Sequence, residues 1–388
     1  MKAVPVKSLN ELVESGVIQL TRGKIISKKD IAACPGSYPI YSSAKDNDGK
    51  FGEYGNFLFD EELITWSVDG GGRLFHRPKH RFSVTNVGGV LRILDKSVLE
   101  YRYLYYALTL RHSEIAFDWV KKAHPSVIKR LYNDIPIPTL PAQQRIVGIL
   151  DEAFEGIATA KTNAAKNLQN AHALFQSHLQ SVFTQRGEDW VERQLGDIAE
   201  FKNGLNFSRQ SKGKTLCIVG VGDFQDRAVV PIDSLQSVTI DGDLGDDYLI
   251  RRDDILTVRS NGSKNLVGRC MLVPEVKEIT SFSGFIIRLR FNTREISPRF
   301  LLHFMKSSET RNRLTSDGGG ANISNINQAK LSELPISLPS FKQQEGIANR
   351  LDTLLEEAQR LVNIYERKLA AIDDLKKSLL HQAFSGHL

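Results

Sequence analysis

The sequence has few cysteines and no long apolar run, and both features exclude classes of protein. Only three cysteines occur among 388 residues, Cys34, Cys217 and Cys270. Their wide separation excludes a disulfide framework and a CxxC metal knuckle. No stretch approaches the roughly 18 uninterrupted apolar residues of a membrane-spanning helix, so we expect no membrane association. The N-terminus lacks the long apolar core of a secretory signal, so we expect a cytoplasmic protein.

Catalytic signatures are also missing. Residues 213–215 (Gly-Lys-Thr) resemble the end of a phosphate-binding loop, but that loop needs glycine at position 208, which is serine. The triple glycines at 70–72 and 318–320 lack the GxGxxG spacing of a dinucleotide site. There is no Pro-Pro pair, which argues against an amino-methyltransferase. The nine histidines include no HExxH and no metal spacing with cysteine. We therefore predict no catalytic residue, no metal and no cofactor.

An internal repeat is present instead. Residues 135–154 resemble 334–355, with Gln143-Gln144 matched to Gln343-Gln344, and 174–184 resemble 375–385 at an offset of 201. Fainter pairs keep the same order upstream, namely 7–14 with 193–200, 61–70 with 253–262, and 102–108 with 299–305. Because chance similarity would not preserve this order, the chain is a tandem duplication.

Two proline-free segments, 142–184 and 341–388, have the apolar spacing of long helices. Apolar residues recur at steps of three or four, which buries a helix face against another helix. A helix of about 40 residues spans roughly 60 Å, longer than a usual core helix. We predict that the two helices pair as an antiparallel coiled coil, with the second stripe formed by Ile347, Leu351, Leu354, Ala358, Leu361, Tyr365, Ile372, Leu375, Leu379 and Ala383.

The remaining segments read as mixed α/β units, because short β-rich runs are separated by Gly, Asn and Asp clusters. The predicted class is α+β, with two recognition units and two long helices in a pseudo-twofold tandem repeat. The expected division is unit 1–141, helix 142–184, unit 185–340 and helix 341–388. Their formal net charges are +5, zero, +1 and zero, so the whole excess of +6 lies in the two units.

Basic residues gather in loops of both units, mixed with Ser, Asn, His and Tyr. Arg and Lys suit phosphates and guanine edges, and Asn suits adenine edges, so these loops predict contacts with nucleic acid. The alternative for any single loop is a solvated surface. The predicted DNA contacts are Arg22, Lys24, Lys28, Tyr41, Arg73, Arg77, Lys79, Arg81 and Lys122 in the first unit, and Arg209, Lys212, Arg259, Asn261, Lys264, Asn265 and Arg313 in the second.

The sequence resembles the specificity (S) subunit of type I restriction-modification systems. The resemblance covers the whole chain and is carried by the phrases IPIPTLPAQQRIVGILD (135–151), WVERQLGDIAEFKNG (190–204) and SLLHQAFSGHL (378–388). It implies a non-catalytic protein that reads a bipartite, asymmetric site on double-stranded DNA with two target-recognition domains. Its helices would dock two methyltransferase (M) subunits, and restriction (R) subunits would join through the assembled complex.

Other functions remain open at this point. One is a stand-alone sequence-specific regulator, or the recognition module of another defence system. A second is a fused methyltransferase-specificity enzyme, against which the absent methyl-donor motifs argue. A third is a coiled-coil scaffold whose basic loops are incidental.

Overall fold

The computed structural model describes residues 4–43, 47–69, 71–115, 122–207, 211–225, 227–263, 265–316 and 325–385. The chain forms two compact units. Unit 1 comprises residues 1–165 and 367–388, and unit 2 comprises residues 166–366. Each unit therefore contains a globular part and one section of each long helix, α5 (Leu140–Thr184) and α9 (Phe341–Phe384).

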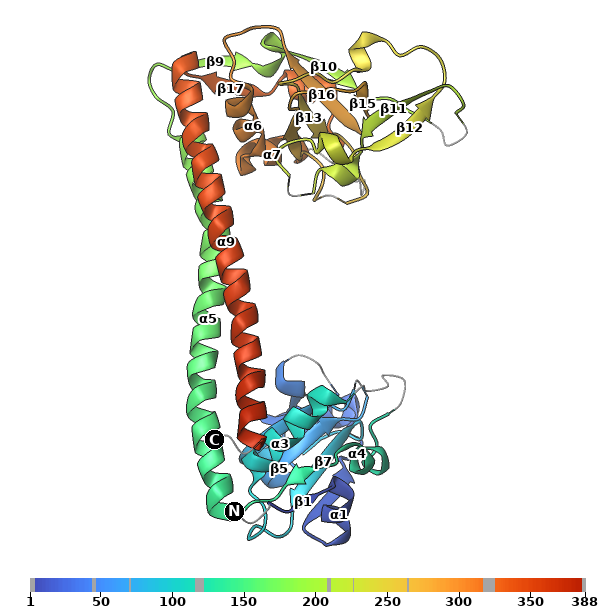
Figure 1. Cartoon of the computed structure of the whole chain (residues 1–388), viewed down its shortest axis with the longest axis vertical. Helices are drawn as coiled ribbons and strands as arrows, with labels where there is room; N and C mark the ends of the chain where they lie inside the picture. The colour runs from blue at the N-terminus through green and yellow to red at the C-terminus, as the bar shows by residue number, and fades with distance from the viewer. Residues whose placement is uncertain are drawn as a thin grey trace. The chain divides into compact units, whose positions relative to one another are not determined.

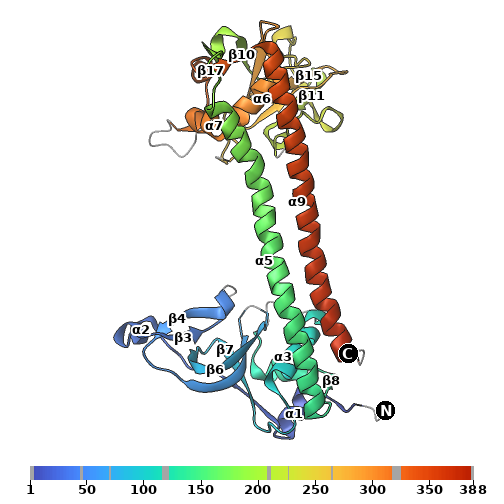
Figure 2. The same ribbon diagram turned by 90° about the vertical axis from the view of Figure 1, so that its left-hand side faces the viewer.

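Unit 1 is built on a six-stranded sheet in the order β2-β7-β5-β6-β3-β4, antiparallel throughout except for the parallel pair β3–β6. Its strands are β2 (Ile18–Arg22), β3 (Tyr38–Tyr41), β4 (Lys50–Tyr54), β5 (Phe59–Ser67), β6 (Leu74–Val84) and β7 (Gly88–Ile93), and a separate pair joins β1 (Val6–Lys7) to β8 (Ile135–Pro136). Its helices are α1 (Leu9–Glu14), α2 (Lys28–Ala33), α3 (Tyr101–Glu114) and α4 (Pro125–Leu131), with a 3-10 turn η1 (Asn47–Gly49) (Figures 1 and 2).

Unit 2 repeats this topology with one strand interrupted. The orders β10-β16-β13-β14 and β15-β11-β12 follow the unit 1 order, β14 and β15 together taking the place of β6, and β11–β15 is again the parallel pair. The strands are β10 (Ala199–Asn203), β11 (Lys214–Val219), β12 (Gln236–Ile240), β13 (Ile255–Val258), β14 (Cys270–Leu272), β15 (Thr280–Phe282) and β16 (Ile286–Phe291), with β9 (Val191–Gln194) paired to β17 (Pro335–Leu338). The helices are α6 (Pro298–Lys306), α7 (Ser308–Thr315) and α8 (Gln328–Ser332), with 3-10 turns η2 (Leu195–Asp197), η3 (Val221–Asp223), η4 (Ile232–Ser234) and η5 (Asp246–Tyr248).

The core of each unit lies between the sheet and one helix. In unit 1, Trp66 of β5 and Leu104 of α3 are buried in one cluster. In unit 2, Leu289 of β16 and Phe300 of α6 are buried in the equivalent cluster. The duplication and the α+β class predicted from the sequence are thus confirmed.

Sections of the two long helices lie side by side and antiparallel within each unit (Figures 1 and 2). In unit 1, Leu150 of α5 and Leu380 of α9 share the core cluster with α3, and Lys161 Nζ lies 2.5 Å from Asp373 Oδ1. In unit 2, Leu179 of α5 shares a cluster with Leu351 of α9. The helices therefore complete the cores of the globular parts.

The predicted apolar stripe of the second helix is wrong at two positions. Leu361 and Leu375 are 36% and 50% exposed, whereas Val362, which the prediction omitted, is 5% exposed. Steps of three and four residues allow two overlapping stripes in a Leu-rich helix, and periodicity alone does not choose between them. The buried stripe shares Ala358 with the predicted one but continues through Val362 instead of Leu361.

A buried glutamine joins the start of each long helix to its globular part. Gln143 is fully buried; its Oε1 accepts from the backbone N–H of Glu100 at 3.0 Å, and its Nε2 donates to the carbonyls of Val98 and Pro138 at 2.8 and 2.9 Å. In unit 2, Gln344 Oε1 accepts from Ser297 N at 2.9 Å and Nε2 donates to the carbonyls of Glu295 and Pro339.

These contacts correct the alignment of the repeat. The counterpart of Gln143 is Gln344, not Gln343, because the offset of 201 continues through the glutamine pair. Gln343 is exposed and instead accepts from Ser340 N at the start of α9. At this offset Gln343 corresponds to Ala142 and Glu345 to Gln144, so the two glutamine pairs are one residue out of phase.

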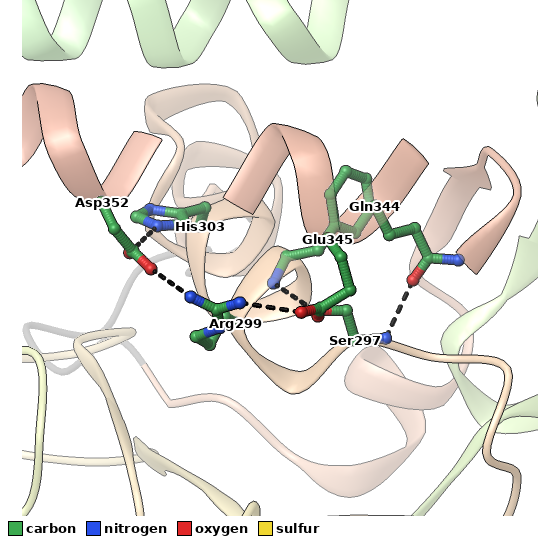
Figure 3. Close-up of polar contacts among 7 residues, drawn as sticks. Ser297, Arg299, His303, Gln344, Glu345 and Asp352 are labelled. Carbon is green, nitrogen blue, oxygen red and sulfur yellow. Dashed lines mark hydrogen bonds and ion pairs between the residues drawn. The ribbon is translucent and has the colours of Figure 1, made fainter. Parts of the chain in front are cut away.

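An arginine and an aspartate form a second attachment eight residues further along each helix. In unit 2, Arg299 of α6 donates to Asp352 at 3.0 Å and to Glu345 at 2.8 Å, and His303 Nε2 lies 2.7 Å from Asp352 (Figure 3). Burial raises the pKa of Asp352, but the hydrogen bond from His303 and the neighbouring positive charges outweigh it and hold that pKa below its usual value.

Unit 1 has the same arrangement. Arg102 of α3 lies 2.6 Å from Asp151 of α5, and the Tyr106 hydroxyl donates to the same carboxylate at 2.6 Å, in the place that His303 occupies in unit 2. Each long helix is thus held at two points by polar contacts with the helix that covers the sheet.

We predict that Gln143→Ala destabilises unit 1 by about 2 kcal/mol, because it leaves buried backbone donors and acceptors without partners. Urea unfolding of the full chain measures this. The matched control is Gln144→Ala, since Gln144 is the next residue and is exposed. Its effect should stay within about 0.5 kcal/mol. Equal small effects of the two substitutions would contradict the attachment.

Candidate nucleic-acid interface

Several strand ends and loops meet at one end of the unit 1 sheet, which we call the loop end. The strand β2 ends at Arg22 opposite Gly89, and β5 ends at Ser67 opposite Gly88. The start of β6 joins them, because Ser67 N donates to the carbonyl of Arg73. The segment before α4 also reaches this place, where Ala123 N donates to the carbonyl of Val68. Residues from five separate stretches of sequence thus gather at one edge.

Hydroxyl groups hold the loops of this edge together. Ser42 Oγ lies 2.8 Å from Thr85 Oγ1, joining the loop after β3 to the β6–β7 turn. Ser43 Oγ donates to the carbonyl of Val87 at 2.5 Å and accepts from Asp69 N at 3.2 Å. The loops are therefore fixed to one another before any ligand binds, which favours a preorganised binding surface.

A glycine is required where β2 and β10 leave the sheet. At Gly23 a Cβ would lie 2.0 Å from the carbonyl oxygen of Val84, and at Gly204 it would lie 2.3 Å from that of Phe282. In both units the following residue then forms a parallel bridge, Lys24 with Thr85 and Leu205 with Ser283. The glycine thus brings the next residue to the same place at each loop end.

Four of the predicted DNA contacts gather at the unit 1 loop end, and all four are exposed. Arg22 donates Nε to the Asn86 carbonyl at 2.9 Å, which leaves its charge without a carboxylate among the described residues. Lys24 follows it across Gly23. Arg73 lies 5.2 Å from the centre of the Phe75 ring, and Lys122 lies 3.5 Å from Asp69.

The other predicted contacts of unit 1 lie elsewhere. Lys28 is exposed on α2, and Lys79 is exposed within β6. Arg81, also on β6, donates to Asp60 at 3.2 Å and to the Tyr38 hydroxyl at 3.3 Å, so part of its hydrogen-bonding capacity is used.

Arg77 is buried in unit 1, and Tyr41, on which it stacks, is half-buried. Arg77 is 5% exposed, stacks 3.5 Å from the centre of the Tyr41 ring, and donates to Thr65 Oγ1 at 3.0 Å and to the Asp48 carbonyl at 2.6 Å. Burial lowers the pKa of Arg77 to about 10, and the nearby Tyr41 and Asp48 oppose that shift. This geometry gives Arg77 a role in holding the segment around Asp48, not an exposed contact.

Three predicted residues of unit 2 lie at its own loop end, in the segment between β13 and β14. Arg259 N donates to the carbonyl of Phe285, and the carbonyl of Arg259 accepts from Ile326 N. The buried Nε of Arg259 has no hydrogen-bond partner within the described part of the chain. Asn261 Oδ1 accepts from Ser263 N at 2.8 Å, which forms a turn, and Asn265 is exposed.

The remaining predictions in unit 2 are separate from this edge. Lys212 precedes the outer end of β11, where its N–H donates to Asp241 at 2.8 Å. Arg313 is paired with Glu309 at 2.6 Å on α7. Arg209 and Lys264 lie outside the described residues.

Backbone contacts make the two loop ends comparable position by position, and the comparison reveals a difference in charge. Arg22 pairs with Gly89 as Asn203 pairs with Ile287, and Lys24 and Leu205 form the same bridge. Three cations of unit 1 therefore correspond to neutral residues of unit 2: Arg22 corresponds to Asn203, Lys24 to Leu205 and Lys122 to Asn325. The reverse holds at one position, where Val68 of unit 1 corresponds to Arg259 of unit 2.

Sequence reasoning missed a second group of cations in unit 2. Arg227, Arg269, Lys306 and Arg311 line one pocket, although they are separated by up to 84 positions in the sequence. The stretch ETRNRL (309–314) contains both Arg311 and Arg313, and only helix phase distinguishes them. Arg313 faces Glu309 one turn back, whereas Arg311 donates to the Val267 carbonyl at 3.2 Å.

Two other features are absent from the described part of the chain. No helix there has the length and apolar character needed to cross a membrane. No group of three or more His, Cys, Asp and Glu side chains in those residues could hold a metal ion.

Comparison with known proteins assigns the family. The family model described as the type I restriction modification DNA specificity domain matches residues 1–167 and again 187–366. The chain belongs to this family. The two matches coincide with the two copies of the internal repeat, and they confirm the resemblance found in the sequence.

Two curated relatives carry specificity-subunit names. The type I restriction enzyme StySPI specificity subunit of Salmonella potsdam is 28% identical over 270 residues, which is 66% of this chain and 58% of that protein. This chain thus matches somewhat more than half of the Salmonella protein. A putative type I specificity subunit of Mycoplasma pneumoniae is 26% identical over 350 residues and 87% of each chain.

Two solved structures share the fold. A chain from a structure of the type I R-M system, described for its complex assembly and conformational transition, aligns over the full length of both chains with a TM-score of 0.68 at 15% identity. The HsdS subunit of Thermoanaerobacter tengcongensis aligns over 96% of this chain and 97% of its own with a TM-score of 0.55 at 15% identity.

We predict that Lys24→Ala weakens duplex binding about equally on all sequences and lowers the slope of log affinity against log salt by about 1, because one phosphate contact is lost. Fluorescence anisotropy across a salt series measures both. Lys166→Ala is the control, since Lys166 is an exposed cation on α5 outside the loop end. A sequence-dependent loss would instead make Lys24 a base-reading residue.

Proposed function

We propose that this chain is the DNA-recognition subunit of a type I restriction-modification complex. In this proposal it reads a bipartite, asymmetric site on double-stranded DNA, and it has no catalytic activity or cofactor of its own. The observation that carries the proposal is the repeated loop end, a preorganised edge built on the same backbone in both units but lined by different side chains.

The difference between the loop ends supports different half-sites. Unit 1 presents Arg22, Lys24 and Lys122 where unit 2 presents Asn203, Leu205 and Asn325. Cations suit phosphates and guanine edges, whereas amides suit adenine edges. We therefore infer that unit 1 takes more of its affinity from the DNA backbone, and that the two half-sites differ in sequence. The other predicted cations, such as Lys28 and Lys79, would serve as peripheral phosphate contacts.

The long helices are proposed to hold the two readers apart and to dock partner subunits. Both helices carry no net charge, which suits protein contacts better than phosphate contacts. Large apolar side chains are nevertheless exposed on them, including Leu174, Leu361, Ile364 and Leu375 at 36% to 50%. Exposed apolar side chains of this size favour a protein interface.

The proposed partners are two methyltransferase (M) subunits on the helices, with restriction (R) subunits joining through the assembled complex. Those partners would supply the adenine-N6 methylation and the ATP-dependent cleavage. In functional terms we propose four parts, with readers at 1–141 and 185–340 and spacers at 142–184 and 341–388.

We predict that a host supplied with this chain and its M subunits acquires N6-methyladenine at one split, non-palindromic sequence. Single-molecule methylome sequencing measures this directly. The control is the same host with the M subunits alone, which should show no such motif. Copurification without any methyltransferase, together with an unmethylated host, would favour the alternative of a stand-alone regulator or another defence module.

We predict that lengthening both helices by four residues widens the unread gap by about two base pairs and leaves both half-sites unchanged. Four helical residues add about 6 Å, against roughly 3.4 Å per base pair. The insertions should repeat residues 162–165 after Ala165 and residues 363–366 after Glu366, because these points separate the two units and spare the contacts inside each.

Methylome sequencing reads out the gap and the half-sites together. The control lengthens only α5, which should put the helix sections out of register and abolish methylation. An unchanged gap with active methylation in the doubly lengthened chain would refute the spacer role.

A further inference from the structure

An exposed phenylalanine lies in the turn between β15 and β16, which belongs to the loop end of unit 2. Phe285 is 60% exposed. Its N–H donates to Ser283 Oγ at 3.2 Å, and Gly284 N donates to the Leu205 carbonyl at 2.7 Å. Ser283 N donates to the Val219 carbonyl at 3.0 Å. Each backbone N–H of residues 283–285 is thus bound, so the turn holds the aromatic ring in place before any ligand binds.

Arg259 lies beside Phe285 and is equally fixed. It follows β13, which pairs with β16 (Figure 1). Arg259 N donates to the Phe285 carbonyl at 2.9 Å, and the Arg259 carbonyl accepts from Ile326 N at 2.8 Å. The Nε of Arg259 is buried and has no hydrogen-bond partner in the described part of the chain, whereas the residue as a whole is only half-buried. The base of this side chain is therefore enclosed, and its donors remain available to a ligand.

The shared fold requires neither side chain. The corresponding residues of unit 1 are Val68 and Val87, because Val68 N donates to the Val87 carbonyl at 2.9 Å. Val68 is 1% exposed and belongs to the core cluster of unit 1. The same backbone thus carries a core valine in one unit and an arginine in the other. Since a buried donor without a partner costs stability, folding alone does not account for Arg259.

The positions around the pair favour contacts with bases over contacts with phosphates. Arg22 and Lys24 of unit 1 correspond to Asn203 and Leu205, so unit 2 has neutral residues at two positions where unit 1 has cations. Phosphate contacts tolerate a mobile cation, whereas the planar fork of a fixed guanidinium matches the paired acceptors of a guanine edge.

We propose that Arg259 and Phe285 determine the sequence read by unit 2 by contacting neighbouring base pairs in the major groove. Arg259 donates to O6 and N7 of a guanine, and Phe285 packs against the C5-methyl group of a thymine, both of which are exposed in that groove. The backbone hydrogen bond between the two residues places their side chains on adjacent bases. This role rests on the proposed function, since it states how unit 2 reads its half-site.

Selection of bound duplexes from a randomised library, with the full chain, tests the assignment. Arg259→Val and Phe285→Val introduce the residues that unit 1 has at these places, so both variants should fold. We expect Arg259→Val to lose the preference for one guanine and Phe285→Val to lose the preference for the neighbouring thymine. The half-site read by unit 1 should stay the same in both variants.

Base analogues in the selected duplex test each contact by fluorescence anisotropy. Replacing the guanine by 7-deazaguanine removes the N7 acceptor and should weaken binding of the wild-type chain about tenfold, with no further loss in Arg259→Val. Replacing the thymine by uracil removes the methyl group and should weaken wild-type binding about fourfold, with no further loss in Phe285→Val. A uniform loss over all sequences in Arg259→Val, with a salt slope lowered by about 1, would make Arg259 a phosphate contact and overturn its assignment.

Arg252→Gln and Ile279→Ala are the matched controls, because they remove an exposed cation and an exposed apolar side chain from the same sheet region. Both residues precede their strands, Arg252 before β13 and Ile279 before β15, and so lie at the strand ends away from the pair. Neither control should change a selected base. Thermal unfolding should place Arg259→Val at or above wild type, because a buried donor without a partner has been removed.

The outcomes separate this proposal from the proposed function. If the wild-type chain selects a split site and both valine variants select the same two half-sites, the pair is overturned and the proposed function stands. If the wild-type chain shows no preference among duplexes, the pair and the proposed function fall together.

Discussion

The buried glutamine at the start of each long helix is the contact on which the rest of each unit depends. Its amide satisfies one backbone N–H and two backbone carbonyls that would otherwise be buried without partners, and no apolar side chain can replace it. One of the two carbonyls belongs to the proline just before the long helix. The other carbonyl and the backbone N–H belong to the segment that leads into α3 or α6. The glutamine therefore fixes the rotation and the height of the helix relative to the sheet.

The aspartate eight residues later then meets the arginine of the covering helix in both units. Two attachments along one helix determine its direction as it leaves the globular part, whereas one would leave it free to pivot. In unit 2 the second attachment is extended, because Glu345 adds a carboxylate where unit 1 has Gln144. The spacer role proposed for the helices requires this kind of fixed exit from each unit.

Most of the fold followed from the sequence, because a repeat leaves its order in the chain even when identity is low. Two details did not follow. The glutamine pair was aligned one residue out of register, since a sequence comparison has no means of knowing which amide is buried. The stripe through Leu361 and Leu375 looked as apolar as the true one, and only packing selected Val362.

The prediction of the site was less complete, because composition locates basic loops but says nothing of what their side chains touch. Arg77 and Lys24 look alike in the sequence, yet one is enclosed by Tyr41 and Thr65 and the other is exposed.

The separation of attachment residues from loop-end residues has a consequence for how such a chain can change. The glutamine and aspartate contacts involve the helices and the approach to α3 or α6, whereas the loop end consists of strand ends and turns. Substitutions at positions such as Lys24 and Leu205 therefore leave the scaffold intact, which is why the same backbone carries three cations in one unit and neutral groups in the other.

Unit 2 has its cations in a different place, at the β14 edge, where Lys306 and Arg311 converge. The net charge of +1 over residues 185–340 does not reveal where these cations lie, because it sums every charged residue of that segment. The position of charge, rather than its sum, is what distinguishes the two units.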